Sequence, residues 1–547
     1  MSAHDKPRPA ETAVTERRSS PDTPRLALGG EATIGVGLLA GCAAMLAFAP
    51  LIHLPLALSE FDQKRFMQLM LLLVTAAAYA LSRDLRHHVA AELSSLPRTG
   101  LVALGLVLTL GAASSAQAES PRHAFAEMAL LLGLGLYAVT LAGALRPVLP
   151  AARHWFAIMV LAMMGLYLLR TAGAYVAWLT TIQLEINELL VGLGHKRFFG
   201  HWLTLTLPLS ALPVLLLRSP WARAGALLVA SLWWSIAYGS GGRGTFLGVG
   251  AAIAFTAMTV PKARAWCALQ VLCALTGFAL AFTLFELPTR GSDAVIGMER
   301  LSGQVGTAGA NEGRVVLLLE SAELILDHPL LGIGPMHFAA VGERGHPHNI
   351  VAQLAVEWGL PATAVLMALA LAAAFAWWRL VPAARTAPIV RPAIGASLLA
   401  GAVHAMVSGL LIPAYTQLWL ATLAGFALCE FNEMLSPYGR ELDRRPEPRG
   451  QRARYSVPMT SATVAIAWLC CLVALGITTV RDAPLVLQSM RAMQARQVTG
   501  APRFWQYGYV DDARSLRALV EHQPLRKRPR YTLEATLERV HLPFLPD

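Results

Sequence analysis

Long apolar stretches separated by short polar or charged segments dominate this sequence. About thirteen of these stretches have the ~17–25 residues that a helix needs to cross the ~30 Å hydrocarbon core of a bilayer. The pattern therefore predicts an all-α polytopic membrane protein with 12 or 13 transmembrane helices. The expected spans lie near residues 32–51, 66–81, 101–116, 125–145, 155–178, 202–217, 224–238, 245–260, 266–285, 358–378, 393–412, 418–431 and 464–480.

The composition supports this class of protein. Of the 547 residues, 55% are hydrophobic and 14% are charged, and the mean hydropathy is +0.50. These values exclude a soluble enzyme. All six cysteines lie inside apolar stretches, where we expect them to pack against neighbouring helices and not to form disulfides or metal sites. They are Cys42, Cys267, Cys273, Cys429, Cys470 and Cys471.

The net charge of +11 has a topological explanation. If the spans alternate, one set of loops together with the N-terminal tail carries about twice as many Lys and Arg residues as the opposite set. Because cytoplasmic loops of membrane proteins are enriched in these residues, this side is predicted to be cytoplasmic. The excess charge thus gives no reason to expect a nucleic-acid partner. The cytoplasmic set comprises the loops 82–100, 146–154, 218–223, 261–265, 379–392 and 433–458.

The spans divide the chain into three parts. Residues 1–30 have no apolar core and are predicted to form a disordered cytoplasmic tail. Residues 31–480 form the membrane domain, whose largest outer segment is 286–349. Apolar positions between 315 and 326 in that segment predict an amphipathic helix at the membrane interface or over the helix bundle. With thirteen spans the C-terminal extension, 481–547, lies outside, and its apolar spacing predicts short amphipathic helices. It is either a partner-binding or acceptor-binding module or a structural appendage.

Candidate chemistry begins at the end of the large outer segment. The sequence HPHN at 346–349 directly precedes an apolar helical run. A histidine at a helix N-terminus is held neutral by the positive end of the helix dipole, and a neutral imidazole can act as a base. The spacing alone does not decide between His346 and His348, and an interface role without catalysis is the alternative. Two histidines this close do not share a helix face and lack further ligands, so no metal site is predicted.

Cations on the outer side point to a phosphate ligand. Arg243 lies in the glycine-rich break GSGGRGT at 239–245, and Arg314 begins the amphipathic helix. Guanidinium groups bind phosphate oxygens with two parallel hydrogen bonds, so two arginines around one cavity suit a lipid diphosphate. The alternative for Arg243 is a tight hairpin whose arginine reaches lipid phosphates. Possible supporting residues are His346, Asn349, Lys196, Arg197 and Glu357. Arg197 lies beside aromatic residues, which also suit anchoring at the membrane interface.

These segments together resemble one known family. GRG at 242–244, Arg314, DHPLLGIGP at 327–335, HPHN at 346–349 and EWGLP at 357–361 follow the order and spacing of motifs in the O-antigen ligase and polymerase superfamily. The resemblance spans roughly residues 195–430 and is specific as a set. In the first motif, Gly242 stands where that family usually has Ser.

The resemblance implies a GT-C-like, metal-independent, inverting glycosyltransferase of the bacterial inner membrane that needs no cofactor. Its donor would be a glycan linked to undecaprenyl diphosphate, and transfer would occur at the periplasmic face, among membrane lipids. In this reading His348 matches the catalytic histidine, and Arg243 and Arg314 match the two arginines that bind the diphosphate. The large loop and the C-terminus would then be periplasmic.

Two questions stay open at this level. The acceptor is expected to be lipid A-core, as in O-antigen ligases, with a Ser or Thr hydroxyl of a protein or a second lipid-linked glycan as alternatives. The thirteenth span and the extension exceed the usual twelve-span plan of the ligases. For this reason a protein acceptor is retained as an alternative. A non-enzymatic transporter or binder of lipid-linked glycans is the competing class. Catalysis requires that His348, Arg243 and Arg314 converge on one cavity, whereas a transporter is expected to show internal repeats.

Overall fold

The structure is a computed structural model, and it describes residues 32–54, 58–181, 190, 192–289, 308–341, 345–383, 389–443, 461–494 and 505. Within these ranges the chain is helical and contains no strand, which confirms the all-α class. The predicted N-terminal tail and the predicted amphipathic segments after residue 505 lie outside the described residues.

Each of the thirteen predicted spans coincides with a helix of the described residues. Span six is interrupted at Pro208, where α8 passes through a short 3-10 segment, Leu207–Leu209, into α9. The spans correspond to α1 (Ala32–Phe48), α2 (Glu60–Leu81), α4 (Arg98–Gln117), α5 (Pro121–Leu145), α6 (Leu149–Thr181), α8 (Lys196–Thr206) with α9 (Leu212–Leu216), α10 (Pro220–Ser240), α11 (Arg243–Thr259), α12 (Arg264–Ala281), α17 (Ile350–Ala383), α18 (Val390–Ala405), α19 (Ala414–Asp443) and α20 (Ser461–Gln494).

By length and composition alone, 8 helical segments of the described chain are suited to cross a membrane. One of them, Pro121–Thr180, is 60 residues long and contains both α5 and α6, joined by a 3-10 turn at Arg146–Val148. The eight segments therefore cover nine of the predicted spans. The other four coincide with α1, α10, α11 and α18, of which α1, α11 and α18 have only 17, 17 and 16 residues.

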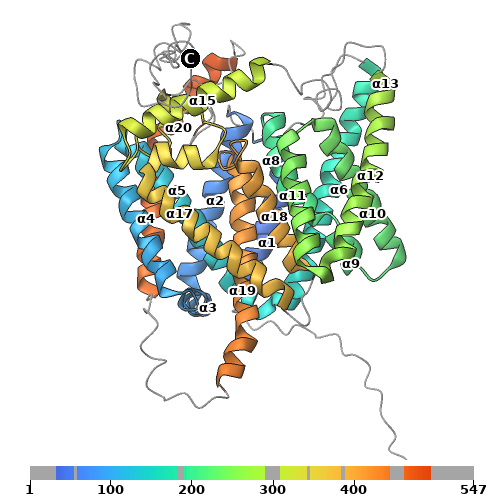
Figure 1. Cartoon of the computed structure of the whole chain (residues 1–547), viewed down its shortest axis with the longest axis horizontal. Helices are drawn as coiled ribbons and strands as arrows, with labels where there is room; N and C mark the ends of the chain where they lie inside the picture. Colours follow the sequence, from blue (N-terminus) through green and yellow to red (C-terminus); the bar gives the residue numbers. More distant parts are fainter. Residues whose placement is uncertain are drawn as a thin grey trace, which may run out of the picture.

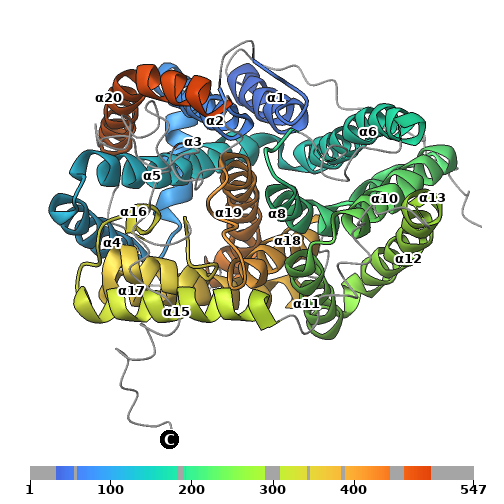
Figure 2. The same cartoon turned by 90° about the horizontal axis from the view of Figure 1, so that it is seen from above.

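The helices stand side by side, and shorter elements cover the two ends of the bundle (Figure 1). At one end α15 (Ala308–Asp327) lies across the helix termini, and α3 (Arg83–Ser94) lies at the other. Seen from above, α15 runs along α17 at the rim of the bundle, while α19 stands near the centre between α5 and α18 (Figure 2). Smaller elements are α13 (Leu287–Thr289) and α16 (Phe338–Val341).

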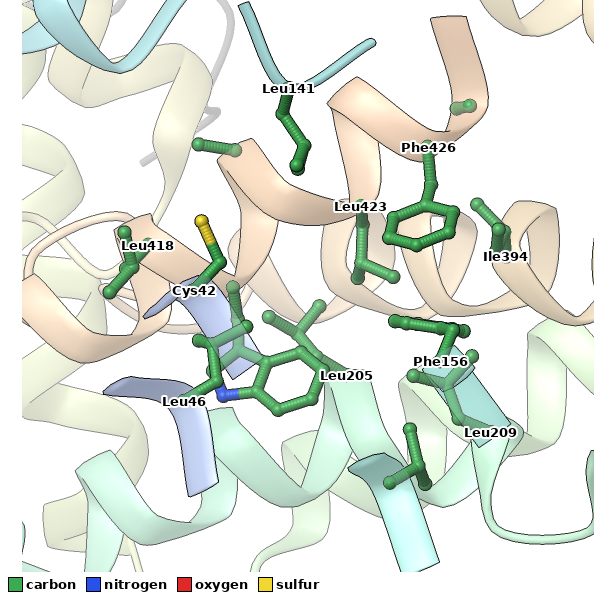
Figure 3. Close-up of a cluster of buried hydrophobic side chains, with 14 of the residues drawn as sticks. Cys42, Leu46, Leu141, Phe156, Leu205, Leu209, Ile394, Leu418, Leu423 and Phe426 are labelled. Atoms are coloured by element: carbon green, nitrogen blue, oxygen red, sulfur yellow. The ribbon is translucent and has the colours of Figure 1, made fainter. Parts of the chain in front are cut away.

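The core lies where α1, α5, α6, α8, α18 and α19 meet (Figure 3). The rings of Phe156 and Phe426 pack with centroids 4.5 Å apart. A methyl group on Gly425 would lie 2.7 Å from the carbonyl oxygen of Ala138, so the missing side chain lets α19 approach the backbone of α5. Because lipid is as apolar as the core, such close packing, and not the hydrophobic effect, holds helices together in a membrane.

The predicted division of the loops into two sides is reproduced by their contacts. At the end that bears α3, Arg146 Nη1 lies 2.7 Å from Glu92 Oε1. At the same end Glu430, which is fully buried, receives hydrogen bonds from Arg153 Nε at 2.6 Å and Arg391 Nε at 2.7 Å. Arg391 Nη2 also donates to Glu433 Oε2 at 2.6 Å. Loops 82–100, 146–154, 379–392 and 433–458 were predicted to share the cytoplasmic side, and contacts at this end involve residues of all four.

At the opposite end the predicted outer segments meet one another. The backbone N–H of Ser120, between α4 and α5, donates to His337 Nε2 at 3.0 Å. Ser461 accepts a hydrogen bond from Tyr79 at the α3 end, whereas Asp482 contacts Arg122 at the α15 end. The thirteenth span, α20, therefore crosses the bundle and brings the C-terminal extension to the end that carries the large loop. Which end faces the periplasm stays a prediction.

The amphipathic helix expected in the large loop is present as α15, but its polarity differs from the expectation. Leu317 and Leu324 point inward against Phe338 and Val356, and Glu320 is buried beside them. Other apolar side chains of α15, including Val315 and Leu318, are exposed. The bundle covers one side of the helix only. Apolar residues therefore occur both on the covered face and on the exposed face of α15.

The ion-pair cluster at Glu430 generates a stability prediction. Arg153 and Arg391 share two carboxylates, those of Glu430 and Glu433. Replacing Glu430 by Gln removes the buried one of the two, which is expected to cost up to about 3–5 kcal/mol. Glu433→Gln is the matched control, because the Glu433 side chain is 43% exposed and a pair of this kind contributes less than about 1 kcal/mol. Thermal unfolding of the full chain in detergent is expected to show a much larger fall of the midpoint for Glu430→Gln. Equal shifts for the two variants would contradict this account.

Candidate active site

His348 occupies a strained backbone position at the start of α17. Its φ is 58°, in the left-handed region that non-glycine residues rarely adopt. This conformation costs about 1–2 kcal/mol for an L-residue. Such outliers persist only where surrounding contacts hold them, and they cluster at functional sites.

His346 is held in place by the backbone of His348. The N–H of His348 donates to His346 Nδ1 at 3.1 Å, and the two rings meet edge to face with centroids 4.0 Å apart. Because Nδ1 accepts this hydrogen bond, the proton of a neutral His346 ring must be on Nε2. His346 therefore has no nitrogen able to accept a proton while this contact lasts. His348 is partly exposed.

Asn349 fixes the loop to two helices. Its Oδ1 accepts from the N–H of Ala352 at 3.0 Å, so Asn349 caps the N-terminus of α17. Its Nδ2 donates to the carbonyl oxygen of Met406 at 3.1 Å. A methyl group on Gly409 would lie 2.5 Å from His346 Cε1, so the ring packs directly on that backbone. The loop that joins α18 to α19 thus forms the floor under both histidines.

A break in α17 anchors the other side of the loop. Gly359 has a φ of 81°, and Pro361 has no N–H, so the carbonyls of Val356 and Glu357 lose their partners within the helix. The turn at 328–334 satisfies them: Ile333 N–H donates to Val356 at 2.8 Å and Gly334 N–H to Glu357 at 3.0 Å. In return Leu360 N–H donates to Pro329 at 2.9 Å.

The backbone carbonyl of Glu357 therefore has a structural role. Its carbonyl also accepts from Ser114 Oγ of α4 at 3.0 Å, and its side chain is buried. The motifs at 327–335 and 357–361 bind each other and α4, and in this way they position the chain that leads to the histidines. The expected partnership of Glu357 with a histidine or an arginine stays a prediction.

A hydrogen-bond chain continues from this turn to the C-terminal extension. His337 Nδ1 donates to Pro335 at 2.9 Å, and its Nε2 accepts from Ser120. Ser120 Oγ lies 2.9 Å from His123 Nδ1, and His123 Nε2 lies 3.3 Å from Asp482 Oδ2. The same Asp482 oxygen accepts from the indole N–H of Trp505 at 2.9 Å. The extension is therefore connected to the loop that carries the site, by way of α5.

Arg243 begins α11 at the break predicted from its glycines. Gly241 ends α10 in the left-handed conformation, with a φ of 64°, and Gly242 precedes the first turn of α11. Thr245 fixes this turn to α8, since its Oγ1 donates to the carbonyl of Gly200 at 2.8 Å. Arg243 is exposed. A guanidinium group beside a helix N-terminus is well suited to bind an anion.

Two buried histidines, His201 and His404, connect the arginine motif to the histidine loop. A methyl group on Gly244 would lie 2.4 Å from His404 Nε2, so this ring packs against the residue after Arg243. His201 and His404 meet edge to face with centroids 5.0 Å apart. Both rings of the loop, His346 and His348, lie within electrostatic range of His201.

Sequence analysis missed these two residues. Each lies in an apolar helix, where a lone histidine usually only packs, and nothing in its spacing marks it. Their polar partners lie far away in the chain: His201 Nε2 is 2.8 Å from Ser408 Oγ, and His404 Nδ1 is 2.6 Å from Thr204 Oγ1. Only the packing of α8 against α18 reveals the cluster, which links the ends of α8, α11, α17 and α18.

The remaining predicted residues lie around this cluster. Arg314 is exposed on the first half of α15, whose N-terminal end lies toward α11 in both views (Figures 1 and 2). Arg197 is in the first turn of α8 and within electrostatic range of His201. The preceding residue, His195, caps α8 by accepting from the Arg197 N–H at 3.0 Å, with partly exposed Lys196 between them. No contact joins Arg314 to Arg243 within the described residues.

The site offers anion-binding and proton-accepting groups. Among the residues that the structure describes, no three His, Cys, Asp or Glu side chains are grouped to hold a metal ion. The imidazoles supply proton-accepting groups, and the exposed guanidinium groups supply positive charge for phosphate. This combination suits transfer of a group from a phosphate ester to a hydroxyl.

Fold and site together define a polytopic α-helical membrane protein whose histidine and arginine motifs meet at one end of the bundle. A family model described as O-antigen ligase matches residues 226–367. The match runs from α10 to the middle of α17 and includes Arg243, Arg314 and His348. This segment is thus similar to the O-antigen ligase family, which supports the resemblance seen in the sequence. The match supports glycosyl transfer of the ligase or polymerase type in general. No curated protein sequence matches the chain.

The contacts of Asn349 generate a prediction for this site. Asn349→Ser keeps an oxygen that can cap α17 but removes the bond to Met406, whereas Asn349→Ala removes both. We expect both variants to lose at least about tenfold in transfer rate, because small displacements of a positioned group carry large rate penalties. Only Asn349→Ala is expected to lose about 1 kcal/mol of stability as well. Transfer rates and thermal midpoints of the purified chains test this. Full activity of Asn349→Ser would show that the Met406 bond does not position His348.

Proposed function

We propose that this protein transfers a glycan from undecaprenyl diphosphate to lipid A-core at the periplasmic face of the bacterial inner membrane. The transfer inverts the anomeric centre and uses no metal. The observation that carries the proposal is the meeting of the Arg243 turn and the His346–His348 loop across His404 and His201. A base and a phosphate-binding cation within one cluster are the two elements that this reaction needs.

In this mechanism His348 is the general base. It accepts the proton of the acceptor hydroxyl while the hydroxyl oxygen forms a bond to the anomeric carbon of the donor. Position and chemistry support this role, since His348 directly precedes the cap of α17, where the helix dipole favours a neutral imidazole. His346 is the weaker candidate, because its Nδ1 already accepts from the backbone of His348.

The two arginines stabilise the leaving group. As the bond between the anomeric carbon and the phosphate oxygen breaks, its electron pair passes to undecaprenyl diphosphate, and negative charge grows on the phosphates. Arg243 and Arg314 are assigned to bind those oxygens in the transition state. The glycosyl diphosphate itself supplies the driving force, so neither ATP nor a covalent enzyme intermediate is required. Direct displacement from the opposite face accounts for inversion.

Lipid A-core is the favoured acceptor because cations surround the cluster on its outer side. Lys196 and exposed Arg197 begin α8 beside His201, where they are able to pair with phosphorylated core sugars. A protein hydroxyl and a second lipid-linked glycan are the alternatives. The acceptor that becomes labelled in the transfer assay distinguishes the three.

The central prediction concerns His348. Purified full-length protein is given labelled undecaprenyl-diphosphate glycan in EDTA, with lipid A-core, a Ser-containing pilin peptide or no added acceptor. We expect transfer to lipid A-core by wild type and a loss of about 10²–10⁴-fold in His348→Ala, the usual contribution of a general base. His154→Ala, an exposed histidine at the other end of the bundle, is the matched control and should keep wild-type activity.

Three outcomes would contradict the proposal. Donor binding without transfer to any acceptor, unchanged in His348→Ala, would indicate a lipid-diphosphate binder or transporter. Loss of activity in EDTA with recovery on adding a divalent cation would overturn the metal-independent mechanism. A His346→Gln variant that loses as much activity as His348→Ala, at an unchanged thermal midpoint, would remove the distinction between the two rings.

The arginines are tested separately. Arg243→Lys keeps a positive charge but loses the planar fork of donors, so we expect a fall in kcat that is smaller than that of Arg243→Gln. For the Gln variants of Arg243 and Arg314, a loss of about 10²–10³-fold in kcat is expected, as for removal of one preorganised donor. Arg218→Gln, in a loop predicted to be cytoplasmic, serves as the control. Equal loss in the control would make the effect one of general charge.

A further inference from the structure

The loop between α18 and α19, residues 406–413, supports the histidine site but is almost entirely apolar. Its sequence is MVSGLLIP, in which Ser408 is the single polar residue. Its first half contacts three side chains of the site. They are Asn349, which donates to the carbonyl of Met406, His201, which is hydrogen-bonded to Ser408, and His346, whose ring packs on Gly409. The position of this loop therefore influences the position of the chain around His348.

Three buried polar side chains hold the other end of the same loop, and we call them the polar triad. Arg65 and Gln68 lie in the first turns of α2, and Gln417 lies in the first turn of α19. Backbone carbonyls shielded from water need donors, which apolar side chains do not supply. The triad provides three: Arg65 Nη2 donates to Ile412 at 3.4 Å, Gln68 Nε2 to Ala414 at 3.2 Å and Gln417 Nε2 to Leu411 at 2.8 Å.

Arg65 also determines which way the two amide groups face. A guanidinium group has only donors, and Arg65 Nη1 donates to the amide oxygens of both Gln68 and Gln417, the latter at 2.6 Å. Because both amide oxygens point toward Arg65, the two amide nitrogens are left to face the loop. A reversed amide would place its oxygen against a carbonyl oxygen. The loop therefore depends on the orientation that Arg65 imposes.

We propose that the polar triad, Arg65, Gln68 and Gln417, positions His348 through the loop 406–413. The triad orients the end of the loop, and the loop passes this constraint on through its contacts with the cap of α17 and with the ring beside His348. The proposal rests on the proposed function, in which His348 is the general base. These three side chains are positioning residues, because they act through the loop and not on the substrate.

Gln417→Glu tests the proposal with a minimal change. Glutamate has the size of glutamine and still accepts from Arg65, but it replaces the donor Nε2 by an oxygen that faces the carbonyl of Leu411. The end of the loop is then expected to shift. Since a displacement of about 1 Å can lower a rate by about 100-fold, we expect kcat for glycan transfer to fall at least about tenfold. The KM for the lipid-linked donor is expected to stay unchanged.

Gln270→Glu is the matched control. Gln270 of α12 is equally buried, and its Nε2 also donates to backbone carbonyls, those of Leu207 and Pro208 at 3.0 and 2.8 Å. The substitution makes the same chemical change in another part of the bundle. We expect it to lower the thermal midpoint at least as much as Gln417→Glu, whose carboxylate pairs with Arg65, but to leave kcat at the wild-type value.

A double-mutant comparison separates positioning from general destabilisation. In the His348→Ala background the positioned base is absent, so Gln417→Glu is expected to leave the residual transfer rate unchanged within about twofold. A fall by the same factor as in the wild-type background would overturn the proposal. Wild-type kcat in the single variant Gln417→Glu would overturn it as well.

Arg65→Lys is the second variant, because it keeps the positive charge and removes the planar fork that holds both amide oxygens. We expect kcat to fall at least about tenfold here too, since the amides of Gln68 and Gln417 lose their fixed orientation. Wild-type kcat in Arg65→Lys would contradict the role of the guanidinium group.

Hydrogen–deuterium exchange tests the coupling without transfer activity. Two amides in the segment 346–352, those of His348 and Ala352, are hydrogen-bonded within the site. In full-length Gln417→Glu in nanodiscs we expect this segment to exchange roughly fivefold faster than in wild type, the effect of weakening one hydrogen bond. Gln270→Glu should exchange there at the wild-type rate.

Unchanged exchange of the segment 346–352 in Gln417→Glu would overturn the coupling itself. Wild-type protein that transfers glycan to none of the three acceptors, while the variant shows the faster exchange, would instead refute the proposed function. The connection between the polar triad and the histidine loop would then still hold. The two failures are therefore distinguishable.

Discussion

In a helix surrounded by lipid every backbone carbonyl needs a donor, and α17 leaves two carbonyls without one where it breaks at Gly359 and Pro361. The turn at 328–334 supplies those donors, and α4 adds a third through Ser114. These hydrogen bonds fix the end of the large loop against α17 and α4. Both histidines of the loop lie between this turn and Asn349, which caps α17.

The second support of the site comes from the packing of α8, α11 and α18. Here small residues matter more than charged ones, because Gly244 and Gly409 let imidazole rings lie directly against backbone. Thr204 is hydrogen-bonded to the ring of His404, and Ser408 to the neighbouring ring of His201. The chemistry of the site is thus assembled on a surface of closely packed helices, and flexible side chains contribute only at its edge.

The sequence allowed the helices to be predicted because a membrane span is a local property, namely some twenty apolar residues in a row. HPHN at 346–349 and the glycine-flanked Arg243 were also recognisable, since each motif is continuous. His201 and His404 were not assigned. Their roles depend on neighbours far away in the chain, and a single polar residue in or beside an apolar helix resembles any other.

The inward position of Glu320 was missed for a related reason. Helical periodicity marks one face of α15 as apolar, but only the neighbours of the helix decide which face turns inward. The division of the loops into two sides was predictable because it depends on a sum over many charges. The contacts of any one loop residue depend on its particular partners.

The strained φ of His348 has a consequence for where the functional unit begins and ends. The neighbours of His348 hold it in this unfavourable conformation. Asn349, the next residue, is bound to the carbonyl of Met406, and the ring of His346 rests on Gly409. Met406 and Gly409, together with His201, lie outside the matched segment 226–367. The boundaries of the family domain therefore cut through the site. The smallest continuous piece of chain that contains all of its groups extends from the beginning of α8 to the beginning of α19.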